Sequence, residues 1–138
     1  MNSKKAVINV CGVQIVDGEK DSTEIDVVGA LTENEGGYTL SYTEYDDDNK
    51  ETETVVCAQG NSVSVSKIGE YTAEMVFEEG KRFNCNYRTP FGSINMGVFS
   101  ETVNSSLTAD GGKIELIYNI DFNTGFVSRN EMTITFNF

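Results

Sequence analysis

The stretch Tyr71–Thr89, which reads YTAEMVFEEGKRFNCNYRT, decides the fold class. Its apolar side chains fall largely on alternate positions, which is the period of a β-strand with one buried face. The alternation is interrupted at Glu78–Gly80 by acidic residues and a glycine, which are typical of a turn. We therefore predict two strands, Tyr71–Phe77 and Lys81–Thr89, separated by this turn.

The same alternation continues along the rest of the chain, with turn residues every eight to twelve positions. No window has the spacing of a convincing amphipathic helix, and a single helical turn is expected at most at Val103–Leu107 or Thr124–Asn130. The sequence predicts an all-β protein of about eight to ten strands, and it leaves open whether Ser106–Ala109 is a strand of its own. The expected strands are Lys4–Val16, Thr23–Thr32, Tyr38–Tyr45, Glu51–Gln59, Ser62–Lys67, Tyr71–Phe77, Lys81–Thr89, Gly92–Val103, Lys113–Phe122 and Glu131–Phe138.

The two ends of the chain indicate how the strands close. The first strand, Lys4–Val16, is apolar on both faces and has Gly12 in its middle, which suits a bent strand at a barrel corner. The last strand continues to Phe138 without a polar tail, and a bare hydrophobic edge strand would invite aggregation. We therefore predict that the first and last strands pair antiparallel and close a single-domain β-barrel over residues 1–138.

The length of the chain, 138 residues, is typical of one domain. Its 22 Asp and Glu outnumber its 10 Lys and Arg, so the net charge is −12. A field of this sign repels phosphate backbones and anionic lipid surfaces, so we expect neither nucleic acid nor membranes as partners. No run approaches the ~20 apolar residues of a membrane-spanning helix, and no signal peptide is recognisable. We expect a cytoplasmic protein, and a protein partner stays undefined.

The sequence offers no pattern for a metal or a cofactor. Zinc sites need clustered Cys and His ligands, but the chain has no histidine, and Cys11, Cys57 and Cys85 lie far apart. Each cysteine lies in an apolar or alternating segment, so we predict reduced and largely buried thiols. The acidic run Asp46–Glu51 places Lys50 where a calcium loop requires an oxygen ligand, so we interpret the run as a solvated hairpin turn.

No catalytic constellation is apparent. Without histidine, general acid–base chemistry would depend on Asp, Glu, Lys or Tyr in a desolvated pocket. Glu44 is the exception among the acidic residues, because it shares the inward phase of Tyr42 at a strand end where a barrel mouth is expected. A lone carboxylate at a mouth is usually solvated, so we expect no enzymatic activity. A buried carboxyl or tyrosine with a strongly shifted pKa would favour an enzyme instead.

The inward-facing tyrosines and methionines are the candidate ligand-binding residues. The interior of a barrel of about eight strands is just large enough to be filled by side chains or to hold one small ligand. Tyrosine hydroxyls need partners when buried, and methionines adapt to irregular volumes, which suits a small, largely apolar or amphipathic ligand. The candidates are Tyr42, Met75, Tyr87, Met96, Tyr118 and Met132.

Three classes of function follow from these residues. The leading hypothesis is a non-enzymatic protein that binds a small, largely apolar ligand inside the barrel. The alternative is a protein-interaction or structural module in which the same side chains fill a solid core. An enzyme whose acid–base site lacks histidine is the third. A cavity in the interior would distinguish the first class from the second.

From about Gly29 onward, three stretches of the chain resemble a known family. They are Leu40–Tyr42, Tyr87–Gly92, and the C-terminal pair of Ile114–Ile120 with Asn130–Ile134. In their order and spacing these stretches resemble the YwiB-like family of small uncharacterised bacterial proteins. The resemblance implies a lipocalin-like barrel of the calycin type, and it implies no catalytic or ligand-binding residues.

Overall fold

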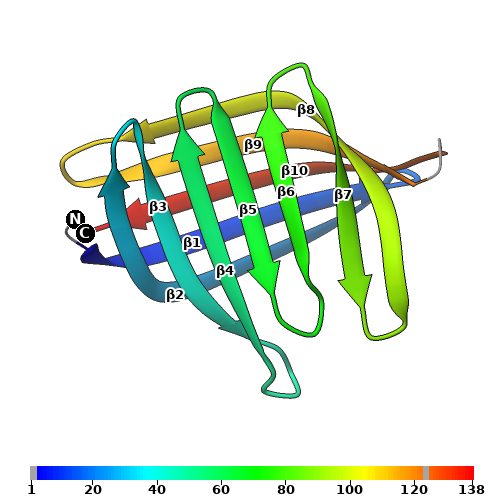
Figure 1. The fold of residues 1–138 in the computed structure, drawn as a ribbon, viewed down its shortest axis with the longest axis horizontal. Helices are drawn as coiled ribbons and strands as arrows, with labels where there is room; N and C mark the ends of the chain where they lie inside the picture. The colour runs from blue at the N-terminus through cyan, green and yellow to red at the C-terminus, as the bar shows by residue number, and fades with distance from the viewer. Residues whose placement is uncertain (1–2, 123–124) are drawn as a thin grey trace.

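The computed structural model describes residues 3–122 and 125–138, and over these residues it contains β-strands and no helix (Figure 1). The strands are β1 (Ser3–Val16), β2 (Glu19–Asn34), β3 (Gly37–Tyr45), β4 (Glu51–Gln59), β5 (Ser62–Ile68), β6 (Ala73–Glu78), β7 (Arg82–Thr89), β8 (Gly92–Leu107), β9 (Gly111–Phe122) and β10 (Gly125–Asn137). The prediction of an all-β protein is therefore confirmed.

Neither candidate helical turn forms among the described residues. Val103–Leu107 is the end of β8, and Gly125–Asn130 is the beginning of β10, while Thr124 lies outside the described residues. Ser106 also belongs to β8, so Ser106–Ala109 is not a strand of its own. β8 extends this far because its second half continues to pair with β9 after its pairing with β7 has ended.

Each strand pairs antiparallel with its neighbours, in the order β6-β5-β4-β3-β2-β1-β10-β9-β8-β7. Strands that are consecutive in sequence are therefore neighbours, except for β6 and β7, which stand at the two ends of this order. The predicted pairing of the first and last strands is confirmed, because Val7–Ile15 of β1 pairs with Arg129–Asn137 of β10.

The barrel is nearly closed, and its seam lies between β6 and β7. Isolated bridges replace a continuous ladder there. Thr72 and Arg88 exchange two backbone hydrogen bonds of 2.9 and 2.8 Å, and the Gly80 amide donates to the Ser100 carbonyl at 2.8 Å. The ladder between the first and last strands lies in the middle of the sheet, so the seam is not at the chain ends, where the sequence predicted closure.

The strands lie in two layers that cross at a steep angle (Figure 1). In this view β4, β5 and β6 pass in front of β1, β10 and β9, and β2 and β8 bend from one layer to the other. Each of these two bent strands has 16 residues. A β-bulge at Glu101, where the register shifts between Ser100 and Thr102, accompanies the bend of β8. The corners are therefore on β2 and β8, and not at Gly12 of β1, where the sequence predicted one.

Close packing fills one half of the barrel interior. The largest fully buried side chains come from the N-terminal halves of β1 and β9, from the C-terminal half of β10, and from the inward phases of β2 to β6 and β8. They are Ile8, Leu31, Leu40, Val56, Val63, Val65, Phe77, Val98, Ile114, Leu116, Ile134 and Phe136. Inward residues nearer the opposite ends of β9 and β10, such as Ile120, Phe122 and Met132, are only partly buried. The interior is thus filled at one end and looser at the other.

The three cysteines are free, but only Cys85 is buried as predicted. Cys11 and Cys57 are half-buried on the outer face. They have the opposite strand phase to the inward-facing Ile8 and Val56, so they cannot enter the core. The prediction of largely buried thiols is therefore confirmed for Cys85, whereas Cys11 and Cys57 are only half-buried.

Iodoacetamide should label Cys57 and Cys11 of the native protein before it labels Cys85. Burial raises the pKa of Cys85, and burial together with the neighbouring Glu24 and Asp26 raises the pKa of Cys11. Because the thiolate is the reactive form, labelling of Cys11 should accelerate as the pH rises beyond the ordinary thiol range. Peptide mass mapping after timed labelling measures the order, and denaturant should make all three thiols react alike. If Cys85 in the native protein reacts as fast as Cys57, its assignment to the core is wrong.

Candidate ligand-binding cavity

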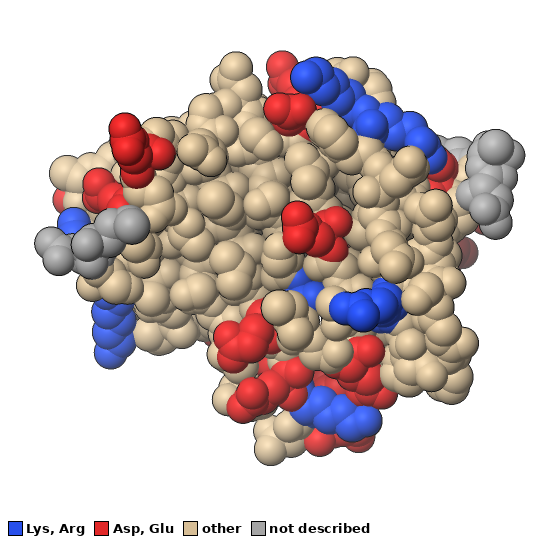
Figure 2. Space-filling model, viewed as in Figure 1, with Lys and Arg blue, Asp and Glu red and all other residues tan. Residues whose placement is uncertain are grey.

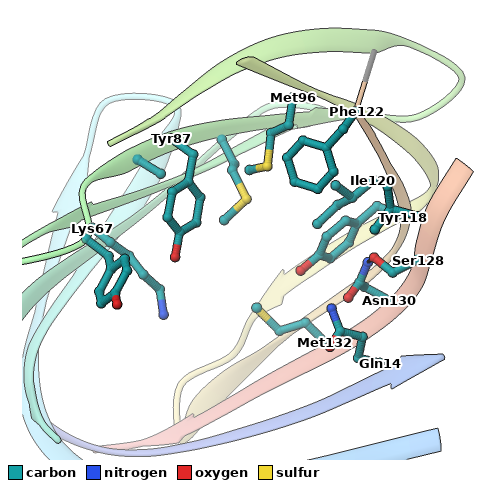
Figure 3. Close-up of a pocket in the computed structure, with 14 residues that line it drawn as sticks. Gln14, Lys67, Tyr87, Met96, Tyr118, Ile120, Phe122, Ser128, Asn130 and Met132 are labelled. Carbon is teal, nitrogen blue, oxygen red and sulfur yellow. Dashed lines mark hydrogen bonds between the residues drawn. The ribbon is translucent and has the colours of Figure 1, made fainter. Parts of the chain in front are cut away.

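A cavity of about 370 Å³ occupies the loosely packed half of the interior (Figure 3). Its lining comes from β1, from β5 to β10, and from Tyr71 in the connection that precedes β6. Besides the three methionines discussed below, the apolar part of the lining includes Ile120 and Phe122. Tyr71 is 47% exposed and Gln14 is also exposed, so the cavity reaches the surface of the protein.

Tyr118 separates the cavity from the packed half of the interior. Its ring contacts the fully buried ring of Phe77 edge to face, with centroids 4.8 Å apart and an interplanar angle of 61°. Its hydroxyl points away from this contact into the cavity (Figure 3). The side chain therefore belongs to the core at one end and presents a polar group to the open space at the other.

Five of the six predicted ligand-binding residues line this cavity: Met75, Tyr87, Met96, Tyr118 and Met132. They come from β6, β7, β8, β9 and β10 in turn, so barrel formation brings them together. Tyr42 is the sixth, and the structure corrects its placement. It is inward-facing as predicted, with 5% exposure, but it belongs to the packed core and is not among the residues that line this cavity.

The sequence prediction missed the polar part of the lining, which is Gln14, Lys67, Ser128 and Asn130. The Asn130 side-chain amide donates a hydrogen bond of 2.9 Å to Ser128 Oγ. Each of these residues continues the inward phase of its strand, as Asn130 does two positions before Met132. A polar residue in an apolar phase is a signal that could have found them, although Glu44 carries the same signal and is not in the lining.

Lys67 is the one charged side chain among the described residues that line the cavity. Its ammonium lies 3.7 Å from Oε2 of Glu44, and both side chains are partly exposed. Glu44 is the carboxylate that the sequence placed at a barrel mouth, but it is not part of the described lining. The lining therefore contains a partly paired cation and, over the described residues, no carboxylate.

The tyrosines near the cavity are held in their neutral form. Burial raises the pKa of Tyr118 to about 12. Burial also raises the pKa of Tyr87, with a smaller contribution from the nearby Tyr71, whose ring centroid is 6.0 Å away. In the packed core, burial and the charge of Glu44 likewise raise the pKa of Tyr42. At neutral pH these hydroxyls are therefore protonated and can donate hydrogen bonds.

The acidic run that resembles a calcium loop forms the turn between β3 and β4. Asp46 Oδ1 accepts hydrogen bonds from the backbone amides of Asp48 and Lys50, each 2.9 Å long, and the Lys50 ammonium lies 3.0 Å from Glu70. Figure 2 shows acidic side chains gathered at the lower end of the molecule, where Figure 1 has this turn. Within the described part of the chain, no group of three or more Cys, Asp or Glu could hold a metal ion, and no helix could span a membrane.

The protein is a nearly closed, ten-stranded antiparallel barrel whose interior is packed at one end and hollow at the other. Residues 8–134 match the family described as "Domain of unknown function (DUF1934)", and the chain belongs to this family. The fold is similar to the crystal structure of the ywiB protein from Bacillus subtilis, with a TM-score of 0.88 and 22% sequence identity over 98% of this chain and 92% of that chain. The predicted YwiB-like family is thereby confirmed. No curated protein matches the chain.

Proposed function

We propose that this protein is a non-enzymatic binding protein that holds a small, largely apolar ligand in the cavity. The observation that carries the proposal is the cavity of about 370 Å³, which lies within the range of small-molecule sites. Protein interiors are normally close-packed. The other half of this barrel is close-packed in this way. A hollow of this size, lined mainly by apolar side chains and open to the surface, is therefore suited to a small ligand.

The lining has the composition of a site for an adaptable apolar or amphipathic ligand. Met75, Met96 and Met132 supply flexible, polarisable surface, which fits apolar bodies of irregular shape. The hydroxyls of Tyr87 and Tyr118 supply a small number of fixed polar groups, which orient a ligand. Apolar area with a few polar anchors is the usual composition of a small-molecule site.

The same groups favour binding over catalysis. A tyrosine that acts as a base must lose its proton, but burial raises the pKa of Tyr118 to about 12, which opposes this. No described lining residue supplies a carboxylate.

We also propose that the protein acts in the cytoplasm, because its cysteines are free. We propose that it does not bind nucleic acid, because its net charge of −12 repels phosphate groups.

Met96→Trp tests the proposal. The indole should occupy the centre of the cavity, so the affinity for the neutral fluorescent probe N-phenyl-1-naphthylamine should fall at least about tenfold. The melting temperature should change little, because the larger side chain enters existing space. Fluorescence titration and thermal denaturation of the parent protein and the variant measure both quantities.

Leu116→Trp is the matched control, since Leu116 lies on the same barrel interior but in the packed half, with 1% exposure. There the added volume has no cavity to enter, and overpacking should cost about 1–3 kcal/mol of unfolding free energy or more. If the parent protein does not bind the probe and Met96→Trp is as destabilised as the control, the interior is effectively solid and the ligand-binding proposal is rejected.

The alternative is a protein-interaction module. The observation in its favour is the side chain of Phe91, which is 93% exposed at the turn between β7 and β8; Ile94, three residues later in β8, is also exposed. Isolated exposed hydrophobic residues are common on soluble proteins, however, whereas a hollow interior is not. The cavity therefore gives ligand binding the stronger support.

A further inference from the structure

Polar groups enter the cavity from two opposite sides (Figure 3). The Lys67 ammonium and the Tyr87 hydroxyl point into it from one side. The side chains of Gln14, Ser128 and Asn130 lie on the other side, where the Asn130 amide already donates to Ser128. One side of the cavity therefore carries an ammonium, which Glu44 pairs from outside the lining, and the other side is polar but neutral.

Strand register places Lys67 and Tyr87 on either side of a small residue. Lys67 is directly opposite Ala73 in the ladder between β5 and β6. The antiparallel bridge between Thr72 and Arg88 puts the next residue, Ala73, opposite Tyr87 across the seam of the barrel. Because the side chain of Ala73 is a single methyl group, it leaves free the space over which the two long side chains converge.

The spacing suits two groups that hold one anion between them. Neighbouring residues on adjacent strands have Cβ atoms about 5 Å apart, so the Cβ atoms of Lys67 and Tyr87 are separated by about 10 Å. Both side chains are long enough to reach inward from these positions to a common point. A carboxylate there would accept hydrogen bonds from the ammonium and from the protonated phenol.

The charge of the cavity differs from that of the whole protein. The chain has a net charge of −12, yet the described lining contains Lys67 and no acidic residue. Glu44 is 3.7 Å from the Lys67 ammonium, which is long for a charge-assisted hydrogen bond, so the ammonium keeps donors for a further partner. A cationic ligand would meet this ammonium without a carboxylate in the lining to compensate.

We infer that the cavity selects an amphipathic ligand with a single anionic head group, whose carboxylate lies between the Lys67 ammonium and the Tyr87 hydroxyl. The apolar body then extends across the cavity toward Met96 and Phe122. This inference rests on the proposed ligand-binding function and names the chemical class of the ligand. The neutral amides on the opposite side leave room for a further uncharged polar group on that ligand.

Displacement of N-phenyl-1-naphthylamine by three molecules with the same apolar chain tests the inference. Decanoate, decanol and decylammonium differ in the charge of the head group; at neutral pH the two ions are used below their critical micelle concentrations and decanol below its aqueous solubility limit. Decanoate should displace the probe at concentrations about tenfold lower than decanol, and decylammonium should be the weakest of the three. Lys67→Gln should abolish the preference for decanoate over decanol. Lys113→Gln, at a half-exposed lysine outside the lining, should retain it.

The possible results separate the two proposals. Equal displacement by all three molecules, or a preference for decylammonium, overturns the anionic head group while ligand binding stands. A preference for decanoate that survives in Lys67→Gln overturns the assignment of the head group to this lysine. A parent protein that does not bind the probe overturns the proposed function, and the inference with it.

Discussion

Removal of Thr133–Phe138 should leave a chain that does not fold. This segment contains the C-terminal part of β10, which pairs with β1 on one side and with β9 on the other. Within it, Ile134 and Phe136 have no solvent exposure. The deletion would therefore expose two strand edges in the middle of the sheet and would open the packed half of the interior.

The expected loss approaches or exceeds the stability of an ordinary domain. Truncation of a buried Ile or Phe to Ala costs about 2–5 or 3–5 kcal/mol, and a typical domain is stable by about 5–15 kcal/mol. The deletion removes both side chains and their backbone hydrogen bonds as well. Circular dichroism and thermal melting measure the outcome. A control that lacks only the exposed Asn137 and Phe138 should stay folded. Native-like β circular dichroism with a cooperative melt in the six-residue deletion would contradict the prediction.

The sequence predicts a strand well where the strand buries one face and less well where it does not. The predicted strand Glu51–Gln59 has the observed bounds of β4, whose inward residues are alternately buried. The second strand was expected at Thr23–Thr32 but extends over Glu19–Asn34. Its first residues, Glu19–Ser22, are exposed and are held by backbone pairing with β1, so no apolar alternation marks them.

The seam of the barrel illustrates a second limit. The turn Glu78–Gly80 separates two well-predicted strands, and nothing in its composition distinguishes it from the turns of the true hairpins. In the structure the Gly80 amide bonds to the Ser100 carbonyl of β8, and β6 and β7 form no continuous ladder; the isolated bridges lie at Thr72 and Glu79, just outside the two ends of β6. Which neighbouring strands fail to form a ladder depends on how the whole sheet curves, and a local pattern does not contain this information.

The candidate site shows why strand phase is only half of a prediction. Phase assigns a side chain to the inner or outer face, and it does so correctly for Tyr42 and Met96, which are both buried. Phase does not give the position of a side chain along the barrel axis, because that position depends on the stagger between strands. For this reason it could not predict that Tyr42 lies in the packed core while Met96 lies at the cavity. Lys67 and Asn130 are polar residues on an inward phase and lie at the hollow end, but Thr54 shares the inward phase of its strand and is fully buried outside the lining.

Phe136→Ala should lower the free energy of unfolding by about 3–5 kcal/mol, because the ring is fully buried and its removal leaves a cavity in the packed half. The ring packs 5.6 Å from that of Tyr38 and covers Gly112, where any side chain would overlap it. Phe138→Ala is the matched control on the same phase of the chain, and its 41% exposure predicts a loss of less than about 1.5 kcal/mol. Urea denaturation measures both. Similar losses in the two variants would mean that Phe136 is not part of the core that holds the first and last strands together.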